Sequence, residues 1–188
     1  SRIVATFTGA LLFLDVRRED WFYSDVRYVV EHGLFHGTTQ ELFSPNAPMT
    51  RGMLVTVLYR LAESPKSAAD SGFADVAAGK YYADAVSWAA ENGIVSGVSD
   101  GRFAPDSKVT REQLAAILYR YAREKRYDTG KTADLTGFAD YEQISGYAAE
   151  ALDWANAEGL VSGRSKTALS PQGQATRAEV AAILHRFA

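Results

Sequence analysis

The strongest constraint on this chain is a pattern that occurs three times with the same internal spacing. In each copy a glycine is followed by a proline 12 positions later, a threonine 17 positions later and an arginine 18 positions later. The arginines are Arg51, Arg111 and Arg177. A unit of this size is too small to enclose a core of its own, so the repeat predicts three units that pack against one another.

Each copy also carries an earlier Phe-x-Asp segment and an aromatic residue between that segment and the glycine. The Asp residues are Asp15, Asp75 and Asp140, and the aromatic residues are Trp21, Tyr81 and Tyr147. The copies recur at intervals of 60 and 66 residues, measured between the arginines. We therefore expect repeats at 13–63, 73–123 and 138–188, with 1–12 as an N-terminal extension from a larger chain.

Hydrophobic periodicity predicts two helices in every repeat. The first is expected at 24–32, 83–92 and 148–158, and it ends at a glycine that adopts the left-handed conformation. The second begins after the threonine and ends near residue 62, near residue 122 and at the C-terminus, with apolar residues at i, i+3, i+4 and i+7. The predicted fold class is all-α, with three tandem helix-loop-helix repeats in a compact pseudo-threefold arrangement.

Composition excludes several classes of function. The net charge of −3 gives no support to nucleic-acid binding. The absence of cysteine excludes disulfides and Cys-ligated metals. No stretch of the sequence reaches the roughly 18 apolar residues of a membrane span, so we expect no membrane insertion.

The Thr-Arg segments combine helix capping with a misplaced cation. Thr110 with Gln113, and Thr176 with Glu179, match the capping-box pattern, and Thr50 retains the cap alone. The following arginine lies in the first helical turn, where the helix dipole disfavours a cation. We therefore expect free helix N–H groups and the guanidinium to bind a carboxylate or phosphate together. An ion pair between each arginine and the Asp of a Phe-x-Asp segment is the alternative.

A second set of arginines needs no functional explanation at this level. Arg60, Arg120 and Arg186 each lie nine residues after the first set. They fall near the ends of the second helices, where the dipole favours a positive charge. We expect them to stabilise the helices only.

Together these residues resemble the S-layer homology domain family. The shared pattern is Phe-x-Asp-Val, an aromatic-rich helix, Gly-Ile-Val-x-Gly, Asp-Gly-x-Phe-x-Pro, Thr-Arg-Ala-Glu and Ile-Leu-x-Arg. Residues 73–120 match it nearly throughout, and the resemblance covers 13–188. It implies a pseudo-trimer with a central helical bundle that anchors a larger surface protein non-covalently to a Gram-positive cell wall.

The resemblance also implies a ligand and its contacts. Grooves between the repeats would bind a secondary cell wall polysaccharide, through a pyruvylated N-acetylmannosamine whose ketal carries a carboxylate. Arg51, Arg111 and Arg177 would bind that carboxylate. The three Asp and three aromatic residues named above are candidate sugar contacts, with turn or capping roles for the Asp residues and core roles for the aromatics as alternatives.

The repeats depart from the family pattern to different degrees. Repeat 1 has Gly52 and Met53 after its arginine and no Asp-Gly turn, whereas repeat 3 lacks the Asp-Gly-x-Phe segment and has one extra residue before Trp154. We therefore expect the grooves that repeat 2 borders to bind best. The module is predicted to be monomeric, extracellular and without a cofactor.

Three competing functions have weaker support. Glu150, Asp153 and Glu158 form no acidic pair that recurs in all repeats, and the three histidines lack metal-ligand spacing, so no catalytic or metal-binding residue is predicted. Residues 99–106 lack the alternating ligands of a calcium loop. A protein-binding module that uses no sugar remains the main alternative.

Overall fold

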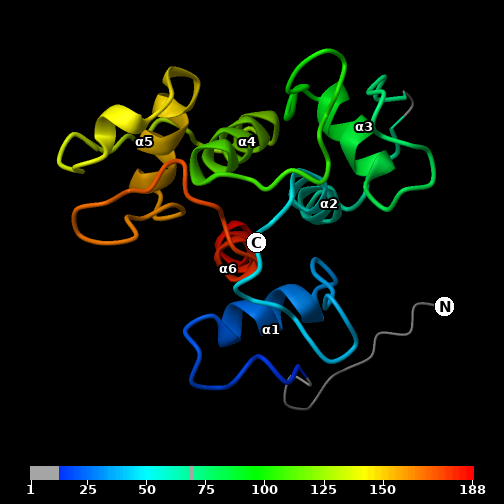
Figure 1. Ribbon diagram of the computed structural model, residues 1–188, viewed down its shortest axis with the longest axis horizontal. Helices are drawn as coiled ribbons and strands as arrows, with labels where there is room; N and C mark the ends of the chain where they lie inside the picture. The colour runs from blue at the N-terminus through cyan, green and yellow to red at the C-terminus, as the bar shows by residue number, and fades with distance from the viewer. Residues whose placement is uncertain (1–12, 68–69) are drawn as a thin grey trace. The chain divides into compact units, whose positions relative to one another are not determined.

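The computed structural model describes residues 13–67 and 70–188, and in this part of the chain it contains helices and no strand (Figure 1). The α-helices are α1 (Tyr23–Glu31), α2 (Arg51–Leu61), α3 (Ala83–Glu91), α4 (Arg111–Glu124), α5 (Ala149–Ala157) and α6 (Arg177–Phe187). Two 3-10 helices, η1 (Tyr141–Gln143) and η2 (Gly146–Ala148), precede α5. The all-α class and the two helices of each repeat are confirmed. The predicted extension at 1–12 lies outside the described residues.

The helix boundaries follow from local sequence. Thr50, Thr110 and Thr176 each accept a hydrogen bond from the N–H three residues on, and at Thr110 the Gln113 side chain completes the capping box. The first helices end before glycines with φ between 67° and 69°. This left-handed conformation strains any residue with a Cβ, so glycine is the residue that ends each helix at low cost.

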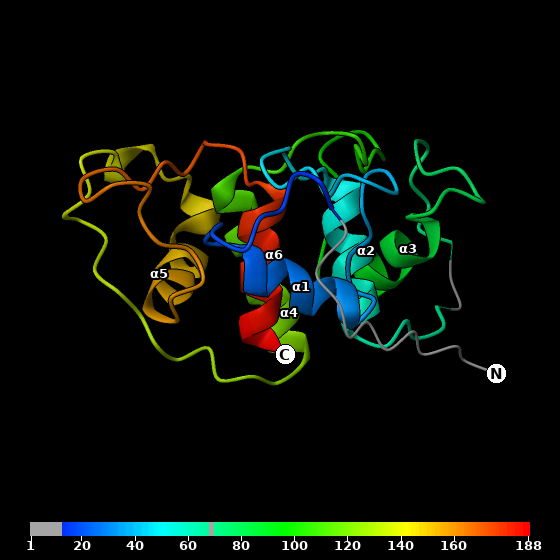
Figure 2. The ribbon, with the colours of Figure 1, turned by 90° about the horizontal axis from the view of Figure 1, so that it is seen from below.

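The described residues form two compact units. One unit contains residues up to Ala47 together with Thr176–Ala188, and in it α1 packs against α6. The other contains Pro48–Ala175, and in it α2 packs against α3 while α4 packs against α5. Figures 1 and 2 show α2 beside α3 in both views.

The packed helix pairs do not coincide with the sequence repeats. Each second helix packs against the first helix of the following repeat, and α6 packs against α1 of the first repeat. The buried residues of α2, α4 and α6 include most of the predicted apolar stripes, such as Leu54 and Leu58 in α2, whereas Leu61 and Phe187 at the helix ends are only half-buried. A repeat as defined by sequence is therefore not a packing unit, because its two helices belong to different pairs.

The segments before the three Thr-Arg motifs meet within the larger unit. The Met49 N–H donates to the Ala175 carbonyl at 2.9 Å, the Val109 N–H to the Met49 carbonyl at 2.8 Å, and the Ala175 N–H to the Val109 carbonyl at 3.0 Å. All three residues are fully buried. This closed set of backbone hydrogen bonds is a local threefold arrangement. The pseudo-trimer with a central bundle, as an arrangement of the whole chain, stays a prediction.

The second glycine of the Gly-Ile-Val-x-Gly segment makes room for the Phe of the Phe-x-Asp segment. A Cβ at Gly97 would lie 3.0 Å from Cε1 of Phe73 and 2.9 Å from the Arg102 carbonyl oxygen. A Cβ at Gly163 would lie 2.7 Å from Cε1 of Phe138. The two parts of the motif therefore depend on each other through close packing.

We predict that Gly97→Ala destabilises the protein by about 1–3 kcal/mol, because the new methyl group overpacks the contact with Phe73. Gly137→Ala is the matched control, since a Cβ there meets no atom within 4 Å. Thermal unfolding of both variants checks this. Equal melting temperatures for the two would contradict the packing account.

Candidate functional site

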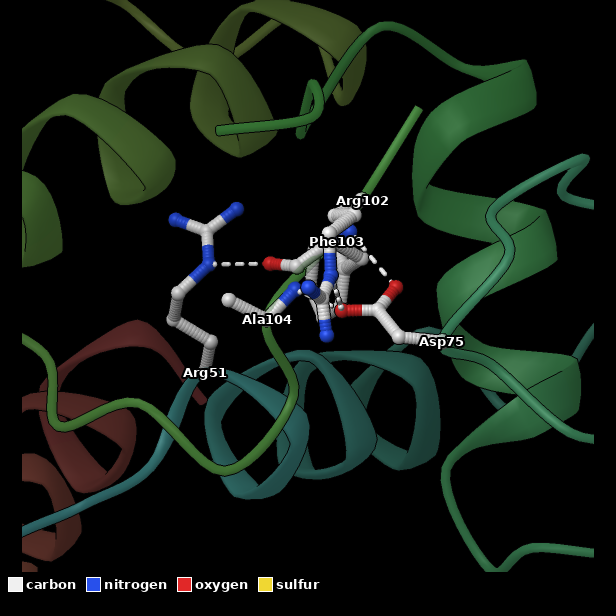
Figure 3. Close-up of polar contacts among 5 residues, drawn as sticks. All are labelled: Arg51, Asp75, Arg102, Phe103 and Ala104. Carbon is white, nitrogen blue, oxygen red and sulfur yellow. Dashed lines mark hydrogen bonds and ion pairs between the residues drawn. The ribbon is translucent and has the colours of Figure 1, made fainter. Parts of the chain in front are cut away.

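The Arg51 side chain extends from the start of α2 to a loop of the following repeat (Figure 3). Its Nε donates to the Phe103 carbonyl at 2.8 Å and its Nη2 to the Ser96 carbonyl at 3.0 Å. The guanidinium carbon also lies 4.5 Å from the centre of the Phe103 ring. Only 7% of Arg51 is exposed, so the guanidinium connects two repeats in a site with little water.

The Asp75 carboxylate binds the N–H of Phe103, the residue whose carbonyl accepts from Arg51. It accepts hydrogen bonds from the Phe103 N–H and the Ala104 N–H, each at 2.8 Å (Figure 3). The Arg102 guanidinium approaches Asp75 at 3.7 Å. Burial raises the pKa of Asp75, but the two N–H groups outweigh it and the pKa lies below its ordinary value of 3.8.

We call this arrangement the loop clamp: an Asp binds the N–H of a loop residue of its own repeat, and an Arg of another repeat binds the carbonyl of that residue. It occurs three times. Leu169 lies between Asp140 and Arg111, and Phe43 lies between Asp15 and Arg177. The second donor of each guanidinium binds the carbonyl of Ser162 or of His36.

The loop clamp also stabilises an unfavourable backbone conformation. The residue after each clamped residue has positive φ without being glycine: 56° at Ser44, 56° at Ala104 and 58° at Ser170. Such residues persist only where surrounding contacts hold them. The second oxygen of each Asp accepts the N–H of this residue, so the carboxylate fixes the strained position directly.

The prediction that the helix N-termini offer free N–H groups to a ligand is wrong. At α2 the Arg51 N–H donates to the Ser107 carbonyl and the Gly52 N–H to the Pro105 carbonyl. The third N–H donates to the Thr50 hydroxyl. The same three kinds of bond occur at α4 and α6. The first N–H groups of each helix thus donate to loop carbonyls of another repeat and to the hydroxyl of the capping threonine. This explains the fixed distance between the proline and the threonine.

The arginines of the Thr-Arg segments therefore have a structural role that the sequence did not predict. Arg111 and Arg177 are each 6% exposed. The hydrogen bonds described above go to carbonyl groups, and for Arg51 no carboxylate of the described residues lies at ion-pair distance. Their role as carboxylate-binding residues stays a prediction, as does the sugar-binding role of the three Asp residues.

A groove of about 490 Å³ lies within the larger unit. Its walls are Arg51, loop residues 95–98, Tyr147 and four residues of α4, among which are Gln113 and Arg120. Two guanidinium groups face this groove and no carboxylate lines it. Burial lowers the pKa of the Arg51 guanidinium below its ordinary value, yet an arginine remains charged at neutral pH. The groove therefore has a positively charged lining, most of which comes from repeat 2.

The three predicted aromatic residues are exposed and not part of the core. Trp21 is 64% exposed, Tyr81 61% and Tyr147 55%. Tyr147 lines the groove, and its hydroxyl donates to Glu112 at 3.3 Å. Their neighbours Phe22 and Tyr82, both 6% exposed, fill the core. An exposed aromatic ring beside polar groups suits contact with a sugar face.

Sequence reasoning missed Arg120 as a site residue. Its position near the end of a helix seemed sufficient to explain it, but its half-buried side chain lines the groove with Arg51. Within the described residues no carboxylate forms an ion pair with Arg120. The available signal was its recurrence, since Arg60, Arg120 and Arg186 hold the same place in every repeat.

The features needed for the competing functions are weak in the described residues. Glu150 accepts a hydrogen bond from Tyr119, and Glu158 pairs with Lys131 at 3.2 Å. No group of three acidic or histidine side chains is placed to hold a metal in this part of the chain. No described helix combines the length and apolar character that crossing a membrane requires.

The loop clamp predicts loss of stability in acid. The pKa values of Asp75 and Asp140 lie below 3.8 because of backbone N–H groups, so their contribution is complete above pH 3.8 and is lost as the pH falls through the lowered values. Asp75→Asn should lower the free energy of unfolding by at least about 2 kcal/mol at pH 7. It should also make the loss of stability at acid pH smaller than in wild type. Urea unfolding at pH 7 and pH 3 checks this, with Asp106→Asn, an exposed residue of the same loop, as the control. If Asp75→Asn lost as much stability between pH 7 and pH 3 as wild type, the Asp75 carboxylate would not stabilise the loop as described.

Comparison with known proteins identifies the repeats. The family model described as "S-layer homology domain" matches residues 12–52, 72–115 and 137–181, which together cover more than half of the chain.

Similar proteins include an amylopullulanase of Thermoanaerobacterium thermosulfurigenes, 30% identical over 96% of this chain and 10% of the relative. A surface-layer 125 kDa protein of Lysinibacillus sphaericus is 31% identical over 86% of this chain and 13% of the relative. A cellulosome-anchoring protein of Acetivibrio thermocellus is 26% identical over 83% of this chain and 36% of the relative. The chain thus spans between a tenth and just over a third of the length of these relatives. With three family matches in tandem and a helical fold, the chain belongs to the S-layer homology domain family.

Proposed function

We propose that this chain is a non-catalytic anchor that attaches a larger surface protein to an anionic cell wall polysaccharide, with pyruvylated N-acetylmannosamine as the bound sugar. Cell-surface anchoring agrees with the family and with relatives named as a surface-layer protein and a cellulosome-anchoring protein. This function places the chain outside the cell, at the cell wall or S-layer.

The range of relatives supports the absence of catalysis in this segment. Of the three relatives described above, one is named as an enzyme and two are named for the cell surface or for anchoring. A segment common to an enzyme and to such proteins suits a shared attachment role better than one reaction. The chain's partner in this proposal is the polysaccharide, and the module acts as a monomer within its parent protein.

The observation that carries the proposal is the groove with two guanidinium groups and no acidic lining. The ketal of a pyruvylated sugar adds one carboxylate to an otherwise neutral ring, and a guanidinium binds a carboxylate through two parallel N–H donors. Tyr147 supplies an aromatic surface for the sugar ring, and loop residues 95–98 supply backbone polar groups. The positive charge and the aromatic lining of the groove both support an anionic sugar as the ligand.

Arg120 and Arg51 have different roles in this scheme. Arg51 already donates through Nε and Nη2 to the loop, which leaves Nη1 as its donor for a ligand. Arg120 lacks an ion-pair partner among the described residues, so its forked donor is available for the carboxylate. By sequence equivalence with Arg51 we propose carboxylate-binding roles for Arg111 and Arg177 as well.

We predict that Arg120→Ala weakens binding of the methyl glycoside of pyruvylated N-acetylmannosamine at least roughly tenfold, the loss expected for one charge-assisted contact. The melting temperature should change little, because Arg120 is not part of the loop clamp. Arg123→Ala removes an exposed cation one turn along α4 and should leave affinity unchanged. Calorimetric titration measures both variants.

The same protein tests the proposed ligand class. It should sediment with purified sacculi and should not sediment with sacculi stripped of polysaccharide by hydrofluoric acid. The glycoside of N-acetylmannosamine without the pyruvyl group should bind far more weakly. Retention on stripped sacculi, or equal affinity for the two glycosides, would refute recognition of an anionic glycan and would favour the protein-binding alternative.

A further inference from the structure

Glu112 is a buried carboxylate that the groove alone does not explain. Only 3% of it is exposed, although it lies in the first turn of α4 directly after Arg111. The equivalent positions in the other repeats hold Gly52 and Ala178. A carboxylate is rarely buried unless its oxygen atoms are hydrogen-bonded, so the burial of Glu112 requires donors around it.

Four donors from the third repeat surround Glu112. The Ser145 N–H donates at 3.0 Å, the Ser145 hydroxyl at 2.7 Å, the Gln172 amide at 2.8 Å and the Tyr147 hydroxyl at 3.3 Å. The Gln172 amide also reaches the Gln143 carbonyl at 3.3 Å. The carboxylate thus joins η1, the residue before η2, and the loop after Pro171 into one hydrogen-bonded group.

The residue just before the partner helix also differs between the repeats. A Cβ at Gly52 would lie 3.0 Å from the ring of Tyr82, the residue just before α3. The residue just before α5 is Ala148 instead of an aromatic. Gly52 thus occurs with an aromatic residue just before α3, whereas Glu112, at the equivalent position of the next repeat, occurs with Ala148 just before α5.

Tyr147 is the member of this group that reaches the groove. It is 55% exposed and lines the groove, while its hydroxyl is directed to Glu112. An exposed tyrosine without such a contact loses rotamer freedom when a ligand orders it, and this loss reduces affinity. A hydroxyl already fixed by a buried carboxylate removes much of that cost.

We infer that Glu112 is a positioning residue that fixes the Tyr147 ring against the groove and so raises its affinity for the sugar. The inference rests on the proposed function, because it gives Tyr147 the sugar as its ligand. Glu112 acts through Tyr147 and does not touch the ligand, since it is not among the residues that line the groove.

A spectroscopic signature in the unliganded protein supports the test. Burial, together with the charge and hydrogen bond of Glu112, raises the pKa of the Tyr147 phenol to about 12. Removal of the charge in Glu112→Gln should lower this pKa, and tyrosine labelled with ¹³C at Cζ reports it by NMR. The readout needs no ligand, so it is independent of the proposed function.

The binding test is a double-mutant cycle of Glu112→Gln and Tyr147→Phe, titrated with the methyl glycoside of pyruvylated N-acetylmannosamine. Each single variant should lose roughly five- to tenfold in affinity, and the double variant should lose little more, because both remove one contact. Glu112→Gly with Ala148→Tyr restores the residue pair of the neighbouring repeat. It should remain folded and still bind more weakly than wild type.

Four outcomes would overturn the inference. Wild-type affinity in Glu112→Gln, or additive losses in the double variant, would show that Glu112 does not act through Tyr147. An unchanged phenol pKa in Glu112→Gln would show that the contact is absent in solution. If wild type itself fails to bind the glycoside, the proposed function fails and this inference fails with it, whereas in the other three cases the proposed function stands.

Discussion

A buried guanidinium that binds a backbone carbonyl of the next repeat is the contact on which the rest of this structure depends. A guanidinium removed from water is stable only where acceptors replace the water. Arg51 finds these acceptors at Phe103 and Ser96, outside its own repeat. Asp75 holds the N–H of Phe103, and the loop is thereby fixed from both sides. Each repeat therefore needs its neighbour in order to bury its arginine.

The same contact relates the fold to the groove. Arg51 binds the carbonyls of Ser96 and Phe103 and so positions the loop at 95–98, which forms one wall of the groove. Part of Arg51 itself forms another wall. Arg120 and Tyr147 then complete a surface with positive charge and an aromatic ring. The loop clamp is thus structural, while the groups best placed for a ligand are those that the clamp does not use, namely Arg120, Tyr147 and the Nη1 of Arg51.

Much of the local structure could be predicted from sequence. Threonine caps, terminal glycines and apolar stripes depend on neighbours along the chain, and they gave the helices to within a few residues. The packing of helices from different repeats against each other could not be predicted, because the stripe on α2 looks the same whichever helix it packs against. Arg51 was expected to bind a ligand through free N–H groups, but the loop carbonyls that occupy those groups lie more than 50 residues away. Glu112 could be understood only beside Ser145 and Gln172, which the sequence does not show to be its neighbours.

Side-chain NMR of ¹⁵N-labelled arginine during titration with the methyl glycoside of pyruvylated N-acetylmannosamine tests the central claim most directly. The account predicts that the Arg120 and Arg51 signals shift with saturation while the Arg123 signal does not, and that the glycoside without the pyruvyl group leaves all three in place. Saturable shifts that spare Arg120 and Arg51, or equal shifts with both glycosides, would contradict it.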